Sequence, residues 1–205
     1  MNKHQSSPLK LGITGGIGSG KSTICKIFSV LGIPSFSADT AASEIMESDS
    51  EIKSKLNTLT GTDLYIEGFM NRKELAGIIF NDPSVLGKVN ALVHPAVFRK
   101  FESWALDQNS PYVIMEAAIL IESGAASLVD RVATVVAPME ERIARVMRRS
   151  SMSKEQIQER MRNQIDDNER IKQSDYIIMN SENDMIIPAI LEIHKDILNN
   201  LNRRM

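Results

Sequence analysis

The stretch that decides the fold is LGITGGIGSGKSTICKIF, residues 11–28. Within it, Gly15, Gly20, Lys21 and Ser22 fit the phosphate-loop pattern G-x-x-x-x-G-K-[ST]. The pattern has the flanks that it requires, because a short apolar run precedes the glycines and apolar residues at helical spacing follow them. A strand, a glycine loop and a helix therefore follow one another in the order that builds a phosphate-binding site.

The glycines indicate how such a loop works. Without Cβ atoms they adopt positive φ angles and let backbone N–H groups converge on phosphate oxygens at a helix N-terminus. We expect Lys21 to reach the β- and γ-phosphates, and Ser22 to place its hydroxyl on Mg²⁺. The predicted nucleotide-binding residues are Gly15, Gly16, Ile17, Gly18, Ser19, Gly20, Lys21, Ser22 and Thr23. The alternative is a glycine-rich turn that binds no ligand.

The rest of the chain alternates short apolar runs with helical stretches. Strands are predicted at PLKLGIT (8–14), IPSFS (33–37), PYVIME (111–116), RVATVVA (131–137) and DYIIM (175–179). This alternation favours an α/β fold with a covered parallel sheet. A mostly helical stretch, residues 40–107, separates the second strand from the third, and we expect it to form an inserted lobe.

Several helix boundaries are also readable. Asn71 and Glu74 have the spacing of a capping box, and Ser153 and Gln156 form a second such pair. PMEERIARVMRR and SMSKEQIQERMRNQ read as consecutive helices whose connection is poor in apolar residues, which favours a mobile flap. A last helix is predicted near residues 185–201. Its predicted apolar side comprises Ile187, Ile190, Leu191, His194 and Leu198.

Composition excludes several classes of protein. The 24 Lys and Arg against 26 Asp and Glu give a net charge of -2, so there is no overall basic field of the kind that nucleic-acid binders carry. The single cysteine, Cys25, excludes an intramolecular disulfide and suits a reducing compartment, so we expect a cytoplasmic protein. No secretory leader is expected, and no run approaches the ~20 apolar residues of a membrane span, so no membrane partner is expected either.

Two carboxylates follow predicted strands. Asp39 comes after the second strand, where a carboxylate can orient an acceptor hydroxyl, take up its proton, or hold Mg²⁺ through water. The alternative is an N-cap for a helix that starts at Thr40. Glu116 ends the third strand and should emerge beside the phosphates, with an ordinary solvated strand end as the alternative.

Arginines give a third signal. Arg142, Arg145 and Arg149 fall at i, i+3 and i+7, so one helix face presents three cations that could stabilise a transferring phosphate. A basic solvated face is the alternative. His94 precedes a proline, which predicts a break between two helices.

Taken together, these pieces resemble the dephospho-coenzyme A kinase family of P-loop kinases over nearly the whole chain. The residues that carry the resemblance are GITGGIGSGKST, SAD ending at Asp39, VHPAV with His94, ILIESG with Glu122, RVMRRSSMSKEQ, RMRNQ ending at Gln164, and SDYIIMN ending at Asn180. The family phosphorylates the ribose 3′-hydroxyl of dephospho-coenzyme A with ATP and Mg²⁺. Its fold is a five-stranded parallel sheet with flanking helices, a helical substrate lobe and a helical lid.

The resemblance implies roles for individual residues. Asp39 matches the proposed base, Arg145 and Arg149 match lid arginines that approach ATP, and Asn180 matches a residue near the adenine. We assign Asp39, Lys21, Arg145 and Arg149 to catalysis, and His94 and Glu116 to substrate binding. The implied divisions are a nucleotide-binding core (9–39, 108–140 and 171–205), a substrate lobe (40–107) and a lid (141–170).

The chain departs from the family pattern in its acceptor half. The family usually has Asp where Ser37 stands and Arg where Ser43 stands, so one carboxylate and one cation are missing here. We expect ATP and dephospho-coenzyme A as small-molecule partners, and a monomer or weak homo-oligomer. The alternatives are a P-loop kinase for another hydroxylated metabolite, or an ATP-binding regulatory module.

Overall fold

The computed structural model describes residues 7–150 and 152–202, and its chain divides into two compact units. The first, here called the sheet unit, comprises residues 1–37 and 104–205, and the second, the helical unit, comprises residues 38–103. The rings of Phe36 and Trp104 lie with their centroids 5.5 Å apart. The chain therefore leaves the sheet unit and returns to it at neighbouring points.

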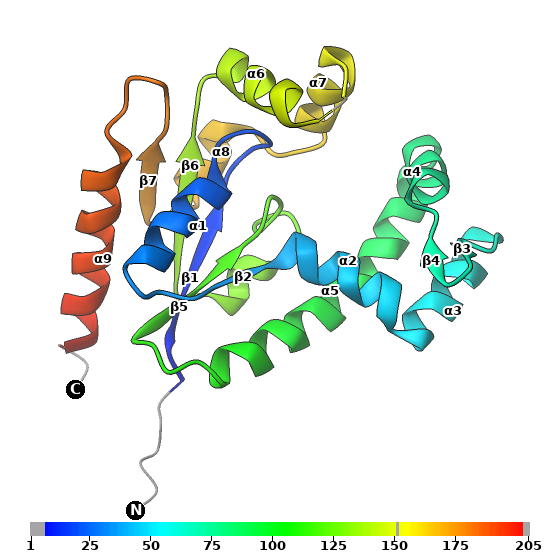
Figure 1. Ribbon diagram of the computed structural model, residues 1–205, viewed down its shortest axis with the longest axis horizontal. Helices are drawn as coiled ribbons and strands as arrows, with labels where there is room; N and C mark the ends of the chain where they lie inside the picture. Colours follow the sequence, from blue (N-terminus) through cyan, green and yellow to red (C-terminus); the bar gives the residue numbers. More distant parts are fainter. Residues whose placement is uncertain (1–6, 151, 203–205) are drawn as a thin grey trace, which may run out of the picture. The chain divides into compact units, whose positions relative to one another are not determined.

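The sheet unit is built on five parallel strands (Figure 1). They are β1 (Leu9–Thr14), β2 (Ser35–Ser37), β5 (Tyr112–Glu116), β6 (Arg131–Val136) and β7 (Tyr176–Met179). Their order is β2-β5-β1-β6-β7, with parallel pairing throughout. All five predicted strands and the α/β fold are confirmed.

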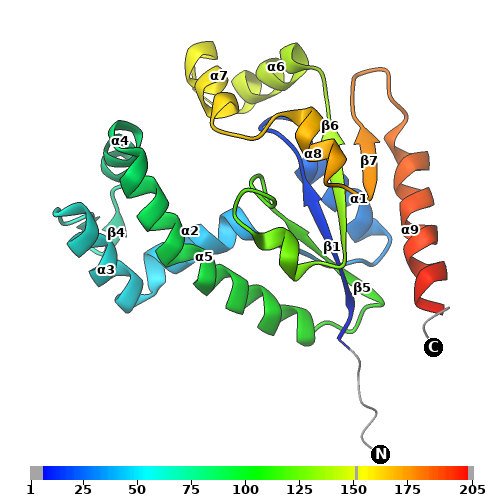
Figure 2. The ribbon, with the colours of Figure 1, turned by 180° about the vertical axis from the view of Figure 1, so that it is seen from behind.

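The core of this unit lies between the sheet and two helices on one face, α1 (Lys21–Val30) and α9 (Ile186–Asn202). Leu11 and Ile13 of β1 are fully buried because both faces of a parallel sheet are covered. Phe28 of α1 meets Tyr112 of β5 edge to face, with ring centroids 6.4 Å apart. The short helix α8 (Asp167–Lys172) lies on the opposite face of the sheet, as Figure 2 shows from behind.

Strand β1 has β5 on one side and β6 on the other, so the order of connections reverses at its carboxyl end. In open parallel sheets, ligands bind in the crevice at such a switch point. The glycine loop leaves β1 at this point.

Two helices follow β6. They are α6 (Met139–Arg149) and α7 (Lys154–Arg162), and they share a small apolar cluster of Ile143, Val146 and Ile157 with Ile17, Met152 and Met161 packed against it. The predicted capping box at the start of α7 is confirmed, because Ser153 and Gln156 bond each other's backbone N–H groups. The cluster includes Ile17 of the glycine loop, so α6 and α7 pack on that loop.

The helical unit contains four helices and a short hairpin within its described residues. They are α2 (Ala38–Ser48), α3 (Ser50–Thr60), β3 (Tyr65–Ile66), β4 (Phe69–Met70), α4 (Arg72–Asn81) and α5 (Pro83–Leu106), whose last turn belongs to the sheet unit. The side chain of Asn71 accepts the N–H of Glu74, as predicted for the start of α4. Arg72 joins α4 to α2 by contacts to Ser43 Oγ at 3.0 Å and to Glu47 Oε1 at 2.8 Å.

One boundary prediction in this unit is wrong, and so is the alternative given for Asp39. Helix α5 continues through Pro95 instead of breaking at His94, because the loss of one backbone hydrogen bond is tolerated within a helix of 24 residues that packs along its length. Helix α2 begins at Ala38, so Asp39 lies inside the first turn rather than capping a helix that starts at Thr40.

The apolar side predicted for the last helix is partly wrong. Ile190, Ile193 and Ile197 of α9 are buried, whereas Ile187 and Leu191 are 57% and 46% exposed. His194 bonds the hydroxyl of Tyr112 at 2.7 Å, which directs this face of α9 onto the sheet. Among the described residues, no helix is long and apolar enough to cross a membrane.

Candidate active site

The glycine loop joins β1 to α1 and turns sharply twice. Gly18 has φ +79°, and Gly20, the N-cap of α1, has φ +103°, so residues with side chains would be strained at either position. The N–H groups in the first turn of a helix are directed toward its N-terminus, because no preceding turn supplies their usual acceptors. In α1 the N–H of Thr23 donates to the carbonyl of Gly20 at 2.9 Å. The loop therefore offers backbone donors at the positive end of a helix dipole, the arrangement that binds phosphate.

Lys21 lies across this loop. Its Nζ donates to the carbonyl of Gly15 at 2.8 Å and to that of Gly16 at 3.5 Å, and the residue is only 9% exposed. Thr14 at the end of β1 and Ser19 within the loop have buried hydroxyls without a hydrogen-bond partner. A buried ammonium beside the N-terminus of a helix suits a polyphosphate group. These residues therefore fit the predicted nucleotide.

Ser22 and Glu116 meet at the mouth of the loop. The Ser22 hydroxyl donates to Glu116 Oε1 at 2.7 Å, although the two residues are 94 positions apart in the chain. Glu116 ends β5 and Ser22 lies in the first turn of α1, so the parallel sheet brings them together. Mg²⁺ bound to a nucleotide takes one or two protein oxygens together with phosphates and waters. This pair supplies oxygens of that kind.

Arg145 and Asn180 converge on the carbonyl of Ser19. Arg145 donates to Ser19 at 3.5 Å and to the Asn180 carbonyl at 2.8 Å, and Asn180 Nδ2 donates to Ser19 at 2.7 Å. Glu141 also pairs with Arg145 at 2.8 Å. These bonds fix Arg145 between the glycine loop and the end of β7.

The three predicted arginines, out of the four in α6, do not form one cationic face. Arg149 is exposed at the end of the helix, whereas Arg142 is buried and donates to the carbonyl of Ile17 at 3.0 Å. Arg142 also pairs with Asp167 at 2.8 Å. Burial lowers the pKa of Arg142, while the charge of Asp167 opposes that shift. Helical spacing alone could not separate these roles, because it does not show what packs on each turn.

Gln164 is a site residue that pattern reasoning assigned only to a family motif. Its Oε1 accepts the N–H of Ile17 at 2.9 Å, and its Nε2 donates to the carbonyl of Ala118 at 3.3 Å. Asp167 and fully buried Arg170 lie behind it and were not singled out at all. Their sequence surroundings, IDDNERIK, look like a solvated helix, so they gave no signal.

Two predicted residues belong to the helical unit. Asp39 is exposed in the first turn of α2, two positions after the end of β2. His94 is half-buried in α5 and stacks on Phe98, with ring centroids 5.9 Å apart. Burial lowers the pKa of His94. The imidazole therefore favours its neutral form.

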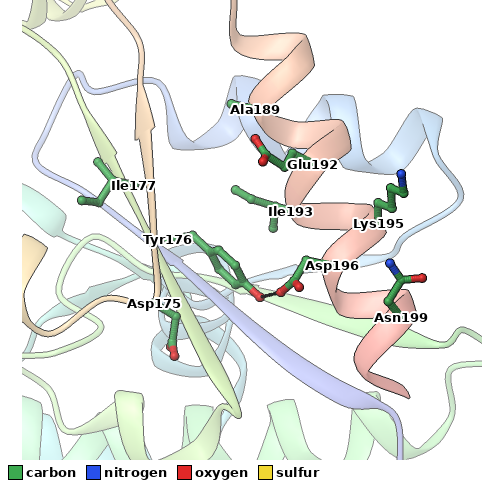
Figure 3. Close-up of a pocket in the computed structure, with 9 residues that line it drawn as sticks. All are labelled: Asp175, Tyr176, Ile177, Ala189, Glu192, Ile193, Lys195, Asp196 and Asn199. Carbon is green, nitrogen blue, oxygen red and sulfur yellow. Dashed lines mark hydrogen bonds between the residues drawn. The ribbon is translucent and has the colours of Figure 1, made fainter. Parts of the chain in front are cut away.

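A separate hollow of about 520 Å³ lies between β7 and α9 (Figure 3). Tyr176 and Asp196 face each other across it, with the tyrosine hydroxyl donating to Asp196 Oδ2 at 2.6 Å. Burial and Asp196 raise the pKa of Tyr176 to about 12. The hollow is lined by the first residues of β7, whereas Asn180 follows the last residue of that strand. None of the predicted site residues lines the hollow.

Comparisons with known proteins agree with this geometry. A family model described as dephospho-CoA kinase matches residues 9–185. The chain is 38% identical over 186 residues to a dephospho-CoA kinase of Bacteroides fragilis, covering 90% of this chain and 91% of that protein. Among solved structures, TT1252 from Thermus thermophilus matches with a TM-score of 0.81 and 32% identity, covering 96% of this chain and 99% of that one. The dephospho-CoA kinase from Campylobacter jejuni matches with a TM-score of 0.65 and 27% identity, covering 96% and 98%.

Proposed function

The chain belongs to the dephospho-coenzyme A kinase family, and we propose that it transfers the γ-phosphate of ATP to the ribose 3′-hydroxyl of dephospho-coenzyme A. The products are coenzyme A and ADP, and the reaction is the last step of coenzyme A synthesis. The observation that carries this proposal is the glycine loop with Lys21 lying across it and Ser22 paired to Glu116 at its mouth.

The loop residues hold ATP in our proposal. Lys21 exchanges its bonds to the carbonyls of Gly15 and Gly16 for the β- and γ-phosphate oxygens, and so stays paired in both states. Ser22 and Glu116 would hold Mg²⁺ together with the phosphates. That ion, when bound, neutralises charge on the phosphates and orients them.

Asp39 acts on the acceptor. As the 3′-oxygen forms its bond to the γ-phosphorus, Asp39 takes the hydroxyl proton, and the bond from that phosphorus to the β-phosphate oxygen breaks to release ADP. Asp39 is exposed, so an acceptor can reach it. The role of Asp39 rests on its match to the family carboxylate.

The arginines of α6 divide the remaining work. Arg145, fixed between Ser19 and Asn180, supports the nucleotide site, while exposed Arg149 at the end of α6 approaches the phosphates when α7 closes over the site as a lid. Closure would exclude water and so suppress transfer of phosphate to water. The buried cysteine, Cys25, is compatible with the cytoplasm as the site of action.

The test is ADP release from MgATP, with and without dephospho-coenzyme A, and identification of the product by mass. We expect release that depends on the acceptor, with one phosphate added at the 3′ position. If ADP appears no faster with this acceptor although ATP binds, the acceptor assignment is wrong. A panel of other hydroxylated metabolites then identifies the substrate.

A further inference from the structure

The peptide groups of Ile17, at the crest of the glycine loop, are held from both sides by side chains from a distant part of the chain. Its N–H donates to Gln164 Oε1 at 2.9 Å, and its carbonyl accepts from Arg142 Nε at 3.0 Å. These partners lie 147 and 125 positions away in the sequence. Neither bond belongs to the secondary structure of the loop.

Each partner is itself fixed. Gln164 Nε2 donates to the carbonyl of Ala118, just beyond the end of β5, at 3.3 Å. Arg142 NH1 donates to Asp167 Oδ2 at 2.8 Å. An amide and a guanidinium that are each held at a second point have less rotational freedom to lose when they bind Ile17.

Arg142 belongs to a network of charges that contains two buried arginines and two partly exposed carboxylates. Asp167 bridges Arg142 and Arg170, whose NH1 donates to Asp167 Oδ1 at 2.6 Å. Arg170 also approaches Glu122 Oε1 at 3.5 Å, and Glu122 accepts the N–H of Ile165 at 3.1 Å. Two arginines and two carboxylates balance their charges, which allows Arg170 to be fully buried and Arg142 to be 7% exposed.

Two glycines of the loop leave room for Arg142. A Cβ added at Gly16 would overlap the guanidinium of Arg142, and one added at Gly18 would overlap the carbonyl of Arg142. Gly16 does not have a positive φ angle, so its lack of a side chain serves close packing rather than backbone conformation. The loop therefore packs directly on α6.

We propose that Gln164 and Arg142 are positioning residues that hold the glycine loop in its phosphate-binding shape by fixing the two polar groups of Ile17. A glycine-rich loop left to itself loses much conformational entropy when it orders around a phosphate. A loop held in advance binds ATP more tightly, because that entropy has already been lost on folding. Ile17 is then an anchor point of the loop, since its N–H is directed to Gln164 rather than to phosphate.

This inference deepens the proposed function, because it states how the same site gains its affinity for ATP. The segment from α6 to α8 supplies Arg142 and Gln164 to the loop and Asp167 to Arg142. ATP affinity therefore depends on the arrangement of that segment even before any acceptor binds.

The first test is the dissociation constant of ATP for Gln164→Leu, measured by equilibrium titration without acceptor. We expect affinity to weaken about fivefold, the usual effect of one neutral hydrogen bond. Asn163→Leu is the matched control, because Asn163 is the adjacent exposed residue and should bind ATP as the native protein does. A thermal melt of each variant checks that it is folded. Equal ATP affinity in Gln164→Leu and the native protein would overturn the inference.

The second test compares Arg142→Met, Arg148→Met as its exposed control, and the double variant Arg142→Met/Gln164→Leu. If both residues act through Ile17, the double variant weakens ATP binding by less than the product of the single effects. If Arg142→Met does not fold, Asp167→Asn replaces it, because it retains an acceptor of similar shape. A lower melting temperature with native ATP affinity would show a purely structural role and overturn the inference.

The two proposals fail separately. A native protein that binds ATP but transfers no phosphate to dephospho-coenzyme A refutes the proposed function, and the comparison of ATP affinities remains valid. A native protein that makes coenzyme A, with variants that bind ATP as tightly as it does, refutes only the positioning roles.

Discussion

The hydroxyl of Ser22 donates to the carboxylate of Glu116 across 2.7 Å, joining the first turn of α1 to the last residue of β5. Ser37 of β2 pairs with Glu116 in the sheet register, so two strands end and one helix begins around this carboxylate. A hydroxyl and a carboxylate in contact are both suited to Mg²⁺ when it arrives with ATP.

Glu116→Gln should raise the Mg²⁺ concentration needed for half-maximal rate by about tenfold. We expect this because loss of a charged ligand makes the free energy of Mg²⁺ binding less favourable by about 1.4 kcal/mol. The amide still accepts the Ser22 hydroxyl, so the fold should be retained. The measurement is initial rate against Mg²⁺ at fixed ATP. Glu140→Gln, an exposed change on α6, is the control. Identical Mg²⁺ curves for the native protein and Glu116→Gln would remove Glu116 from the metal site.

Lys21→Met should lower kcat by about 100-fold or more, because a preorganised cation aimed at the transferring phosphate is lost from a buried position. Lys26→Met lies on the same helix with an exposed side chain and should retain the native rate. Initial rates of ADP release and a circular dichroism spectrum for each variant provide the measurement. A Lys21→Met protein that is folded and fully active would contradict the role given to the glycine loop.

Asp39→Asn should bind ATP normally and lose about 100-fold or more in turnover, the usual contribution of a general base. The residue is exposed in the first turn of α2, so the change should not unfold the helical unit. Asp107→Asn, an exposed change beyond α5, is the control. The measurement is kcat beside the dissociation constant of ATP. Unchanged turnover would exclude Asp39 as the base.

Cys25 should resist thiol reagents in the folded protein. Burial raises the pKa of its thiol to about 12, with the charge of Glu116 as the second cause. Only about one thiol in ten thousand is then ionised at pH 8. The Cys25 residue is also only 4% exposed, so a reagent cannot reach it easily. The measurement is the rate of labelling in buffer and in denaturant. Labelling that is equally fast in both would show that α1 opens readily from the sheet.

His94 should make the protein less stable in mild acid. Because burial lowers its folded pKa below the ordinary value of 6.5, the unfolded chain binds more protons in the window just below that value. Stability contributed by neutral His94 is therefore present above about pH 6.5 and is lost as pH falls through the window. We expect the melting temperature to fall from pH 7 to pH 5, with a shallower fall in His94→Phe. If the melting temperatures of the native protein and His94→Phe fall equally with pH, His94 is not the cause of the loss of stability.

The glycine loop and the positions of the five strands along the chain could be predicted because they depend on local chemistry. Gly20, Lys21 and Ser22 have fixed spacing, and the apolar runs mark buried strands whatever surrounds them. The capping pair Ser153 and Gln156 was predictable for the same reason, since both partners lie within one turn.

Contacts across the chain could not be predicted in this way. Arg142 and Arg149 look alike in sequence, but one is buried against Asp167 and the other is exposed. The continuity of α5 through Pro95 depends on tertiary packing that outweighs a local preference. Likewise, Ile187 and Leu191 repeat at helical spacing on α9, yet the sheet covers the neighbouring face of Ile190, Ile193 and Ile197.

The proximity of Phe36 and Trp104 has a consequence for how this enzyme can change. Since the chain departs and returns at neighbouring points, residues 38–103 form one uninterrupted cassette. Replacing that cassette leaves every strand of the five-stranded sheet and the whole glycine loop covalently intact. Since we propose that the helical unit carries the residues that meet the acceptor, we expect a single exchange of sequence to alter which hydroxyl is phosphorylated while the phosphate donor stays the same.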